Sequence, residues 1–292
     1  MNKPLFLRIV DRIRAEVPYF QQRKNAHGRY GLSTLQKCTA AIRMLAYGQA
    51  GDTCDEYLRL AESTALLCLD NFTTAIIQLY GDEFLRRPTP DDLQRLLDEG
   101  EVRGFPGMIG SIDCMHWEWK NCPTAWRGQY TRGSGKPTIV FDGIYPKWST
   151  FIQSITLPQG PKAELFAERQ ESVRKDVERA FGVLQSRFAI VKNPGLLWNK
   201  EKLGRIMRAC IILHNMIVED ERDTHPRHDT SHFESGESSR NSEVDVFSST
   251  ESLSSIGQMR HTRNEIRDQQ IHNRLKADLV ENLWQMFGNQ DE

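Results

Sequence analysis

Apolar residues recur at helical spacing through the first hundred positions of the chain. Their period of three to four residues predicts amphipathic helices. Thr89 followed by Pro90 also marks a helix start, because threonine is a common N-cap and proline suits the first turn. The predicted helices cover residues 5–17, 34–47, 52–60, 62–80 and a segment that begins at residue 90. We therefore expect residues 1–103 to form a helical domain without strands.

The pattern changes after Gly104, where short apolar runs predict strands. Residues 107–112 form a mainly apolar run that leads to Asp113, and residues 139–141 form a second run that leads to Asp142. Such runs, closed by a polar residue, are typical of buried strands that reach the edge of a sheet. A helical stripe then returns, made of Val173, Val177, Phe181, Leu184 and Phe188. This order of elements predicts an α+β or α/β fold.

Three acidic residues lie in settings that suit metal ligands. Asp113 and Asp142 follow the predicted strands, and Glu178 lies on the later helix. Carboxylates in this order commonly hold two divalent ions for phosphoryl transfer, and hard oxygen ligands favour Mg²⁺ or Mn²⁺. Arg174, one turn before Glu178, would orient that carboxylate and keep it ionised. Taken singly, an Asp before Gly is also typical of a turn, and an Arg–Glu pair of a solvated helix face.

Four sequence motifs resemble the plant PIF/Harbinger-type transposases and the nucleases derived from them. They are residues 104–117 (GFPGMIGSIDCMHW), 142–151 (DGIYPKWSTF), 177–185 (VERAFGVLQ) and 213–216 (LHNM). The resemblance implies an RNase H-like core that carries a DDE triad of Asp113, Asp142 and Glu178 with Mg²⁺ or Mn²⁺. It also implies DNA as the substrate, a Myb-like DNA-binding partner protein and a nuclear location.

The spacing of the triad departs from that family. Thirty-five residues separate Asp142 from Glu178, a familiar DDE spacing, but only 28 separate Asp113 from Asp142. An RNase H-like core needs two further strands and a return crossover there, and each strand takes about 5–6 residues. Because residues 136–140 resemble the start of the second strand and residues 141–143 the end of the fourth, a block after Val140 is predicted to be absent. We expect a truncated core, with Asp142 at a different end of the sheet from Asp113 and with impaired catalysis.

Two further predictions concern DNA contacts. Helices 34–47, 52–60 and 62–80 fit a helix-turn-helix, whose last helix would approach a major groove. A plain helical bundle is an equal alternative, because the start of that last helix offers few cations. A predicted loop after the first strand is basic, and it would either contact phosphates or be solvated. Its cations are Arg127, Arg132 and Lys136.

Several residues near the motifs have ordinary structural interpretations. His116 lies three residues after Asp113, and odd spacing puts two strand side chains on opposite faces. It would support the metal site only if the strand ended at Asp113. Trp117 and Trp119, two residues apart, would share one face in the core. His214, between apolar neighbours, fits a buried core histidine.

Charge is distributed unevenly, although the formal net charge is −1. Residues 1–62 have a net charge of +4, and residues 219–251 have a net charge of −7. Residues 222–256 are rich in Ser, Asp and Glu and predict a disordered linker, in which three histidines fit a solvated tract better than a metal site. Those histidines are His225, His228 and His232. Beyond the linker, residues 257–292 carry the stripe of a terminal helix, formed by Ile271, Leu275, Leu279 and Leu283.

Cysteine usage and hydropathy narrow the class of protein. The six cysteines include no Cys-x-x-Cys pair, which argues against a zinc site and a secreted disulfide framework. No apolar run has membrane-spanning length and no signal peptide is recognised, so we expect a soluble intracellular protein without a membrane partner.

The predicted domains are a helical domain (1–103), a truncated nuclease domain (104–221), the linker (222–256) and the terminal helix (257–292). Two functions remain open. One is a metal-dependent nuclease or strand transferase that acts on DNA. The other is a non-catalytic remnant that binds DNA or a chromatin partner.

Overall fold

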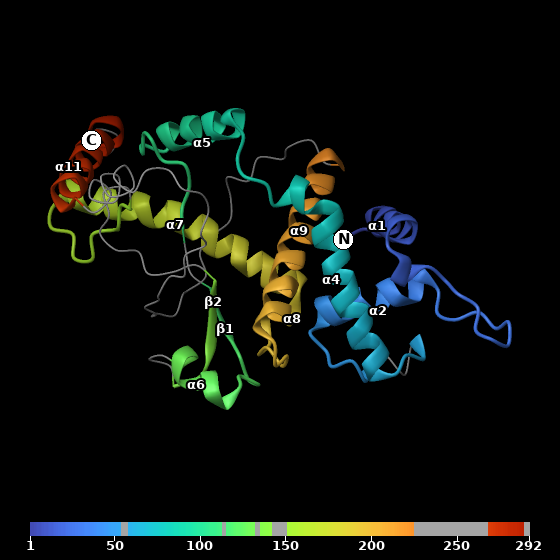
Figure 1. Cartoon of the computed structure of the whole chain (residues 1–292). Helices are drawn as coiled ribbons and strands as arrows, with labels where there is room; N and C mark the ends of the chain where they lie inside the picture. The colour runs from blue at the N-terminus through green and yellow to red at the C-terminus, as the bar shows by residue number, and fades with distance from the viewer. Residues whose placement is uncertain (54–57, 113–114, 132–134, 142–150, 225–267, 289–292) are drawn as a thin grey trace, which may run out of the picture. The chain divides into compact units, whose positions relative to one another are not determined.

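The computed structural model describes the chain except for residues 54–57, 113–114, 132–134, 142–150, 225–267 and 289–292. The described part is mostly helical and contains one two-stranded sheet, which confirms an α+β fold (Figure 1). It consists of two compact units, each built from separate stretches of the chain. The first unit comprises residues 1–86, 116–139 and 182–241, and the second comprises residues 87–115, 140–181 and 242–292. The predicted domains were defined by their expected functions, and the two compact units do not test those functions. The predicted domain boundaries therefore stay a prediction.

Helices account for every element described before Gly104, as the periodicity predicted. They are α1 (Lys3–Glu16), the short 3₁₀ helix η1 (Pro18–Phe20), α2 (Thr34–Tyr47), α4 (Glu62–Phe84) and α5 (Pro90–Val102). The later helices are α6 (Thr124–Tyr130), α7 (Pro161–Arg187), α8 (Ala189–Lys192), α9 (Lys200–Thr224) and α11 (Gln269–Phe287). The strands are β1 (Met115–Glu118) and β2 (Thr138–Phe141), both within the predicted range. None of the described helices combines the length and the apolar character that a membrane span needs.

Side-chain caps fix where several helices begin. Ser33 and Gln36 form a reciprocal capping box at the start of α2, and Thr89 and Asp92 form another at the start of α5. Each box satisfies backbone N–H groups that the first helical turn leaves without a partner. The predicted start at Thr89 is therefore confirmed.

The first unit is a bundle in which α4 packs against both α2 and α9. Large side chains buried within it include Phe20, Phe72, Leu45, Ile76 and Leu213. Burial of such side chains contributes roughly 1.5–3 kcal/mol each relative to exposure. The core is therefore made by helices that are more than a hundred residues apart in the sequence.

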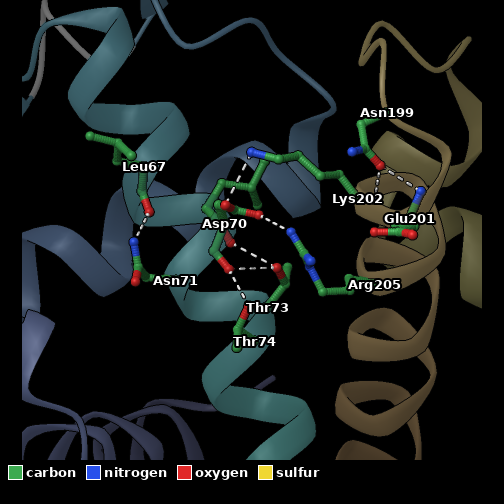
Figure 2. Close-up of polar contacts among 10 residues, drawn as sticks. Leu67, Asp70, Asn71, Thr73, Thr74, Asn199, Glu201, Lys202 and Arg205 are labelled. Atoms are coloured by element: carbon green, nitrogen blue, oxygen red, sulfur yellow. Dashed lines mark hydrogen bonds and ion pairs between the residues drawn. The ribbon is translucent and has the colours of Figure 1, made fainter.

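A charged contact also joins α4 to α9. Asp70 of α4 accepts hydrogen bonds from Arg205 Nη2 at 2.5 Å and from Lys202 Nζ at 3.1 Å (Figure 2). The hydroxyls of Thr73 and Thr74 bond back to the Asp70 carbonyl within α4 (Figure 2). Burial raises the pKa of the Asp70 carboxyl, but its bonds to Arg205 and Lys202 outweigh that effect, so the pKa is lowered.

The second unit is held together by an apolar cluster beneath α11. Phe105, Phe166, Leu279 and Leu283 are buried together, and the rings of Phe105 and Phe166 meet edge to face with centroids 6.0 Å apart. The predicted terminal helix therefore packs on the second unit through Leu279 and Leu283. Ile271 and Leu275, on the same predicted stripe, remain exposed.

The two strands form an antiparallel ribbon. The Trp119 N–H, just after β1, donates to the carbonyl of Pro137, just before β2, at 2.8 Å, so the end of β1 lies beside the start of β2. Trp117 and Trp119 are both buried, which confirms their shared core position, and their indole N–H groups donate to the carbonyls of Asn193 and Leu197. The junction between Val140 and Phe141, where a block was predicted to be absent, lies within β2.

The prediction of a strand at residues 107–112 is wrong. The chain turns there instead, with a positive φ of 83° at Gly107 and a bond from the Met108 N–H to the Phe105 carbonyl, and Ile109 and Ile112 are exposed. A strand needs a neighbour for its backbone hydrogen bonds, and no described strand pairs with these residues. The first strand accordingly begins after Asp113, at Met115.

Two smaller expectations also need correction. Arg127 belongs to α6 rather than to a loop, because residues 124–130 complete two helical turns after Pro123. Residues 222–224 of the predicted linker are helical instead, since α9 continues to Thr224, and residues 225–256 lie outside the described part of the chain. The predicted helix 52–60 also falls partly outside it.

Candidate metal site on helix α7

Glu178, the one predicted metal ligand that the structure describes, lies two-thirds of the way along α7. Arg174 Nη1 donates to Glu178 Oε1 at 2.5 Å, one turn away on the same helix. The same guanidinium holds Glu171 through two bonds, Nη2 to Oε1 at 2.8 Å and Nε to Oε2 at 3.2 Å. Arg174 is therefore fixed by a two-point contact on one side and directs Glu178 on the other.

The electrostatics of this group favour the ionised form of the Glu171 carboxylate. Hydrogen bonds from Arg174 lower the pKa of Glu171, with a smaller contribution from the charge of Lys175, although partial burial opposes the shift. An ionised carboxylate is the form that binds a divalent cation. The predicted role of Arg174 as the residue that orients Glu178 is consistent with this geometry.

A second ion pair fixes α7 to the end of α5. Arg103, the C-terminal cap of α5, donates to Asp176 Oδ2 at 2.6 Å and to Glu99 Oε1 at 2.8 Å. Burial lowers the pKa of Arg103, but these two carboxylates outweigh it and raise that pKa. Asp176 is thereby engaged in holding the second unit together, although it lies only two residues before Glu178.

The segment that leads to Asp113 reaches α7 near Glu178. The Ser111 hydroxyl donates to the Val173 carbonyl at 3.3 Å. Val173 precedes Glu178 by five residues, or about 7.5 Å along a helix axis at about 1.5 Å per residue. The chain two residues before Asp113 is therefore anchored within two turns of Glu178.

Asp113 and Asp142 themselves lie outside the described residues, but the strand ends beside them are described. Because the ribbon is antiparallel, Met115 at the start of β1 and Phe141 at the end of β2 lie at the same end of it. Asp113 precedes Met115 by two residues, and Asp142 follows Phe141 directly. The expectation of opposite ends assumed that residues 107–112 form the first strand, which they do not. The end of the sheet at which each aspartate lies stays a prediction.

Among the residues that the structure describes, no three of His, Cys, Asp and Glu are grouped closely enough to hold a metal ion. A complete site would thus need at least one aspartate that the structure does not describe. His116 lies within β1, where it alternates with the buried Met115 and Trp117. A supporting role for His116 at the metal site therefore stays a prediction.

The predicted basic loop is only partly described. Arg127 lies on α6, Lys136 pairs with Glu118 of β1 at 3.1 Å, and Arg132 lies outside the described residues. His214 is half-buried against Arg187, with Nδ1 3.4 Å from Nη1. His225, His228 and His232 lie in the part of the chain that is not described.

Two supporting residues escaped the sequence analysis. Glu171 pairs with Arg174 at a spacing of three, which is a recognisable helical signal. Ser111 gave no such signal, because its partner is a backbone carbonyl 62 residues away.

Comparison with known proteins places the chain among transposon-derived proteins. A family described as plant transposon protein matches residues 82–142 and 140–225. The two matched segments meet at residues 140–142, as expected if a block is absent there. Curated relatives named "Putative nuclease HARBI1" are 22% identical in Bos taurus and 21% identical in Homo sapiens. Each alignment runs over 235 positions and covers 63% of this chain and 67% of the relative.

No solved structure matches this chain. The family match nevertheless spans the segments that carry Asp113, Asp142 and Glu178, and it includes the turn, the ribbon and all of α7. The chain belongs to the plant transposon protein family of Harbinger transposase-derived, nuclease-like proteins.

Proposed function

We propose that this chain binds Mg²⁺ or Mn²⁺ through Asp113, Asp142 and Glu178 and acts on the phosphodiester backbone of DNA, with cleavage impaired relative to intact members of its family. The observation that carries the proposal is the bond from Ser111 to the Val173 carbonyl, since it holds the approach to Asp113 beside the helix of Glu178. The word nuclease in the names of the mammalian relatives supports the chemistry.

The donor set fits a hard divalent ion. Glu178 offers a carboxylate that is about one-third exposed, and the other two proposed ligands are also carboxylates. Two such ions, when bound, activate an attacking water or 3′-hydroxyl and stabilise the leaving oxygen. Arg174 holds the Glu178 carboxylate in one orientation, and Glu171 in turn holds Arg174.

The architecture we propose is an RNase H-like core that has lost its middle strands. The antiparallel pairing of β1 with β2 is what the first two strands of such a core require. The junction at Val140 and Phe141 would then join the start of the second strand to the end of the fourth. This arrangement would bring both aspartate segments to one end of the ribbon, so metal binding is retained in the proposal.

Impaired cleavage follows from the missing strands. In an intact core those strands would pair with the ribbon and hold its end against the helix that carries the glutamate. Without them, the relative positions of the carboxylates are less restrained, and a misplacement of about 1 Å costs on the order of 100-fold in rate. Metal affinity depends less steeply on such displacements than the chemical step does.

The second candidate is a non-catalytic nuclear remnant that binds DNA or a chromatin partner, such as a Myb-like DNA-binding protein. One observation favours it. Arg174 and Glu178 form an i,i+4 pair of the kind seen on ordinary helix surfaces, which needs no metal to account for it. The helix-turn-helix predicted over residues 34–47, 52–60 and 62–80 would serve either function.

Metal binding and cleavage are best measured separately. Mn²⁺ titration of the full chain, followed by the electron paramagnetic resonance of the free ion, should show saturable binding that Glu178→Ala and Asp113→Ala remove. Glu168→Ala is the matched control, because Glu168 is exposed on the same helix. Cleavage of supercoiled plasmid with Mg²⁺ should be weak and should disappear in the same two variants.

The outcomes separate the two candidates. Mn²⁺ binding that Glu178→Ala abolishes and Glu168→Ala leaves intact supports the metal site, even if cleavage is undetectable. Equal Mn²⁺ binding by the parent chain and by both ligand variants would reject it and favour the non-catalytic remnant.

A further inference from the structure

An exposed hairpin projects from the first unit between η1 and α2. Residues 21–31 extend away from the neighbouring helices as the blue loop on the right of Figure 1. Every one of these residues is exposed, yet the segment has regular structure. Lys24 and Tyr30 form an antiparallel bridge, and Asn25 N–H donates to the Arg29 carbonyl at 2.9 Å. The turn has a defined shape although it buries almost no apolar surface.

Side-chain bonds define the turn and its base. Asn25 Oδ1 accepts from the N–H groups of His27 and Arg29, each at 3.0 Å, which closes the turn. At the base, the buried Thr34 hydroxyl donates to the Phe20 carbonyl at 2.8 Å, and Lys37 Nζ donates to the Tyr19 carbonyl at 2.7 Å. The hairpin is therefore a fixed projection from α2 rather than a free tail.

The hairpin is cationic and lacks counter-charges. Arg23, Lys24 and Arg29 all project from it, and the sequence contains no Asp or Glu from residue 17 to residue 51. In the described part of the chain, none of these three cations forms an ion pair with a carboxylate. Like charges on one short hairpin repel one another, and a bound polyanion would relieve that repulsion.

The neighbouring helix α1 shows the opposite arrangement. Each of its arginines has a carboxylate partner within 3.1 Å. The pairs are Arg8 with Asp220, Arg12 with Glu16, and Arg14 with Asp11. In the described part of the chain, the arginines of α1 are thus paired with carboxylates, whereas Arg23 and Arg29 of the hairpin are not.

The hairpin also presents one aromatic ring. Tyr30 is 68% exposed, and Lys24 Nζ lies 4.7 Å from the centre of its ring. This cation–π contact holds the lysine at a definite position beside the ring. A flat ring beside fixed cations suits the sugar–phosphate edge of a nucleic acid better than it suits an isolated small anion.

We propose that the hairpin of residues 21–31 binds the phosphate backbone of double-stranded DNA through Arg23, Lys24 and Arg29. The choice of DNA as the polyanion rests on the proposed function. The last helix of the predicted helix-turn-helix corresponds to α4, which begins with the exposed Glu62 followed by Ser63 and Thr64. The hairpin supplies the positive charge that the start of α4 lacks. The contact is independent of base sequence, since arginine and lysine at phosphates position a protein without reading bases.

Fluorescence anisotropy with a labelled duplex of about 20 base pairs tests the proposal. The full chain is titrated in EDTA, so binding is measured without metal or cleavage. Changing Arg23, Lys24 and Arg29 together to Gln should weaken binding on the order of tenfold or more at about 100 mM salt. It should also reduce the slope of log affinity against log salt by about 2.7, at about 0.9 per phosphate contact.

A second set of variants controls for net charge and for folding. Arg95, Arg208 and Arg274, all exposed and distant in sequence from the hairpin, are changed together to Gln as the matched control and should leave the salt slope unchanged. Adding a cation at the exposed turn with Ala26→Lys should raise the slope by about 0.9. Circular dichroism establishes that each variant keeps its helices.

The outcomes are distinct from those of the metal experiment. A loss of affinity and slope in the hairpin variant, but not in the control, supports the proposal whether or not the chain cleaves DNA. An equal loss in both triple variants would mean that only net charge matters and would overturn it. Unchanged DNA binding by the hairpin variant would overturn it too, and would leave an acidic protein as the partner to test.

Discussion

Gly104 lies so close to Leu283 of α11 that a β-carbon at residue 104 would fall 2.3 Å from Leu283 Cδ2 and 2.9 Å from Phe287 Cε2. The backbone there has a φ of +88°, which also disfavours any residue with a side chain. The Gly104 carbonyl accepts a hydrogen bond from Asn282 Nδ2 at 3.2 Å. Helix α11 thus packs against the first residue of the motif at residues 104–117, for which the sequence had predicted only a catalytic role.

Gly104→Ala should destabilise the second unit by about 2–4 kcal/mol, from backbone strain of about 1 kcal/mol and from displacement of α11. Gly107→Ala is the control, because Gly107 has a similar φ of +83° but no atom within 4 Å of the added carbon. Gly107→Ala should therefore be destabilised only by the backbone strain, by about 1 kcal/mol. Urea denaturation of the two variants measures the difference, and equal losses would show that α11 does not rest on Gly104.

The Asp70 contact between α4 and α9 should contribute to stability. Asp70→Ala removes a carboxylate that pairs with both Arg205 and Lys202, and we expect a loss of about 1 kcal/mol, because the group is partly exposed. Asp82→Ala, at an exposed site on the same helix, should cost less than about 0.5 kcal/mol. Denaturation midpoints that do not differ between these variants would contradict the proposed contribution.

His214 should make the first unit less stable in mild acid. Burial lowers the pKa of His214, the charge of Arg187 lowers it further, and Glu221 opposes both. The unfolded chain, with a histidine pKa of about 6.5, then binds more protons than the folded chain. The contribution of the neutral His214 to the free energy of unfolding is fully present above about pH 6.5, and it is lost as the pH falls through the lowered pKa of the folded state.

His214→Gln removes this titration, so its stability should change less than that of the parent chain between about pH 7.5 and pH 5. Chemical denaturation at several pH values measures both proteins. Other histidines titrate in the parent chain and in the variant alike, so their effects cancel in the comparison. Parallel pH profiles would refute the assignment to His214.

Restoring the absent block should raise nuclease activity. Inserting the corresponding segment of an intact family member between Val140 and Phe141 would supply the missing strands, and we expect Mg²⁺-dependent cleavage to rise by on the order of 100-fold. An insert of equal length made of Gly and Ser is the control. Robust cleavage by the parent chain itself, lost on Asp142→Ala, would disprove the proposed impairment.

Local patterns in the sequence determined the helices. The capping signal at Thr89, the stripe of α7 and the apolar face of α11 each specify a helix through contacts within a few residues, so they could be predicted without knowledge of the fold. The motifs also identified the family, and they predict a break at Val140. These features depend on residues that are near one another along the chain.

Only the tertiary structure decided which segments meet. Residues 107–112 have the composition of a strand, yet a strand exists only where another strand can satisfy its backbone bonds, and the chain turns there instead. For the same reason the ribbon forms at Met115 and carries the ends next to Asp113 and Asp142 to one side. The contact of Ser111 with Val173 of α7 joins residues 62 positions apart, and the contact of Leu283 with Gly104 joins residues 179 positions apart. No local sequence pattern encodes such contacts, because they depend on how separate elements pack.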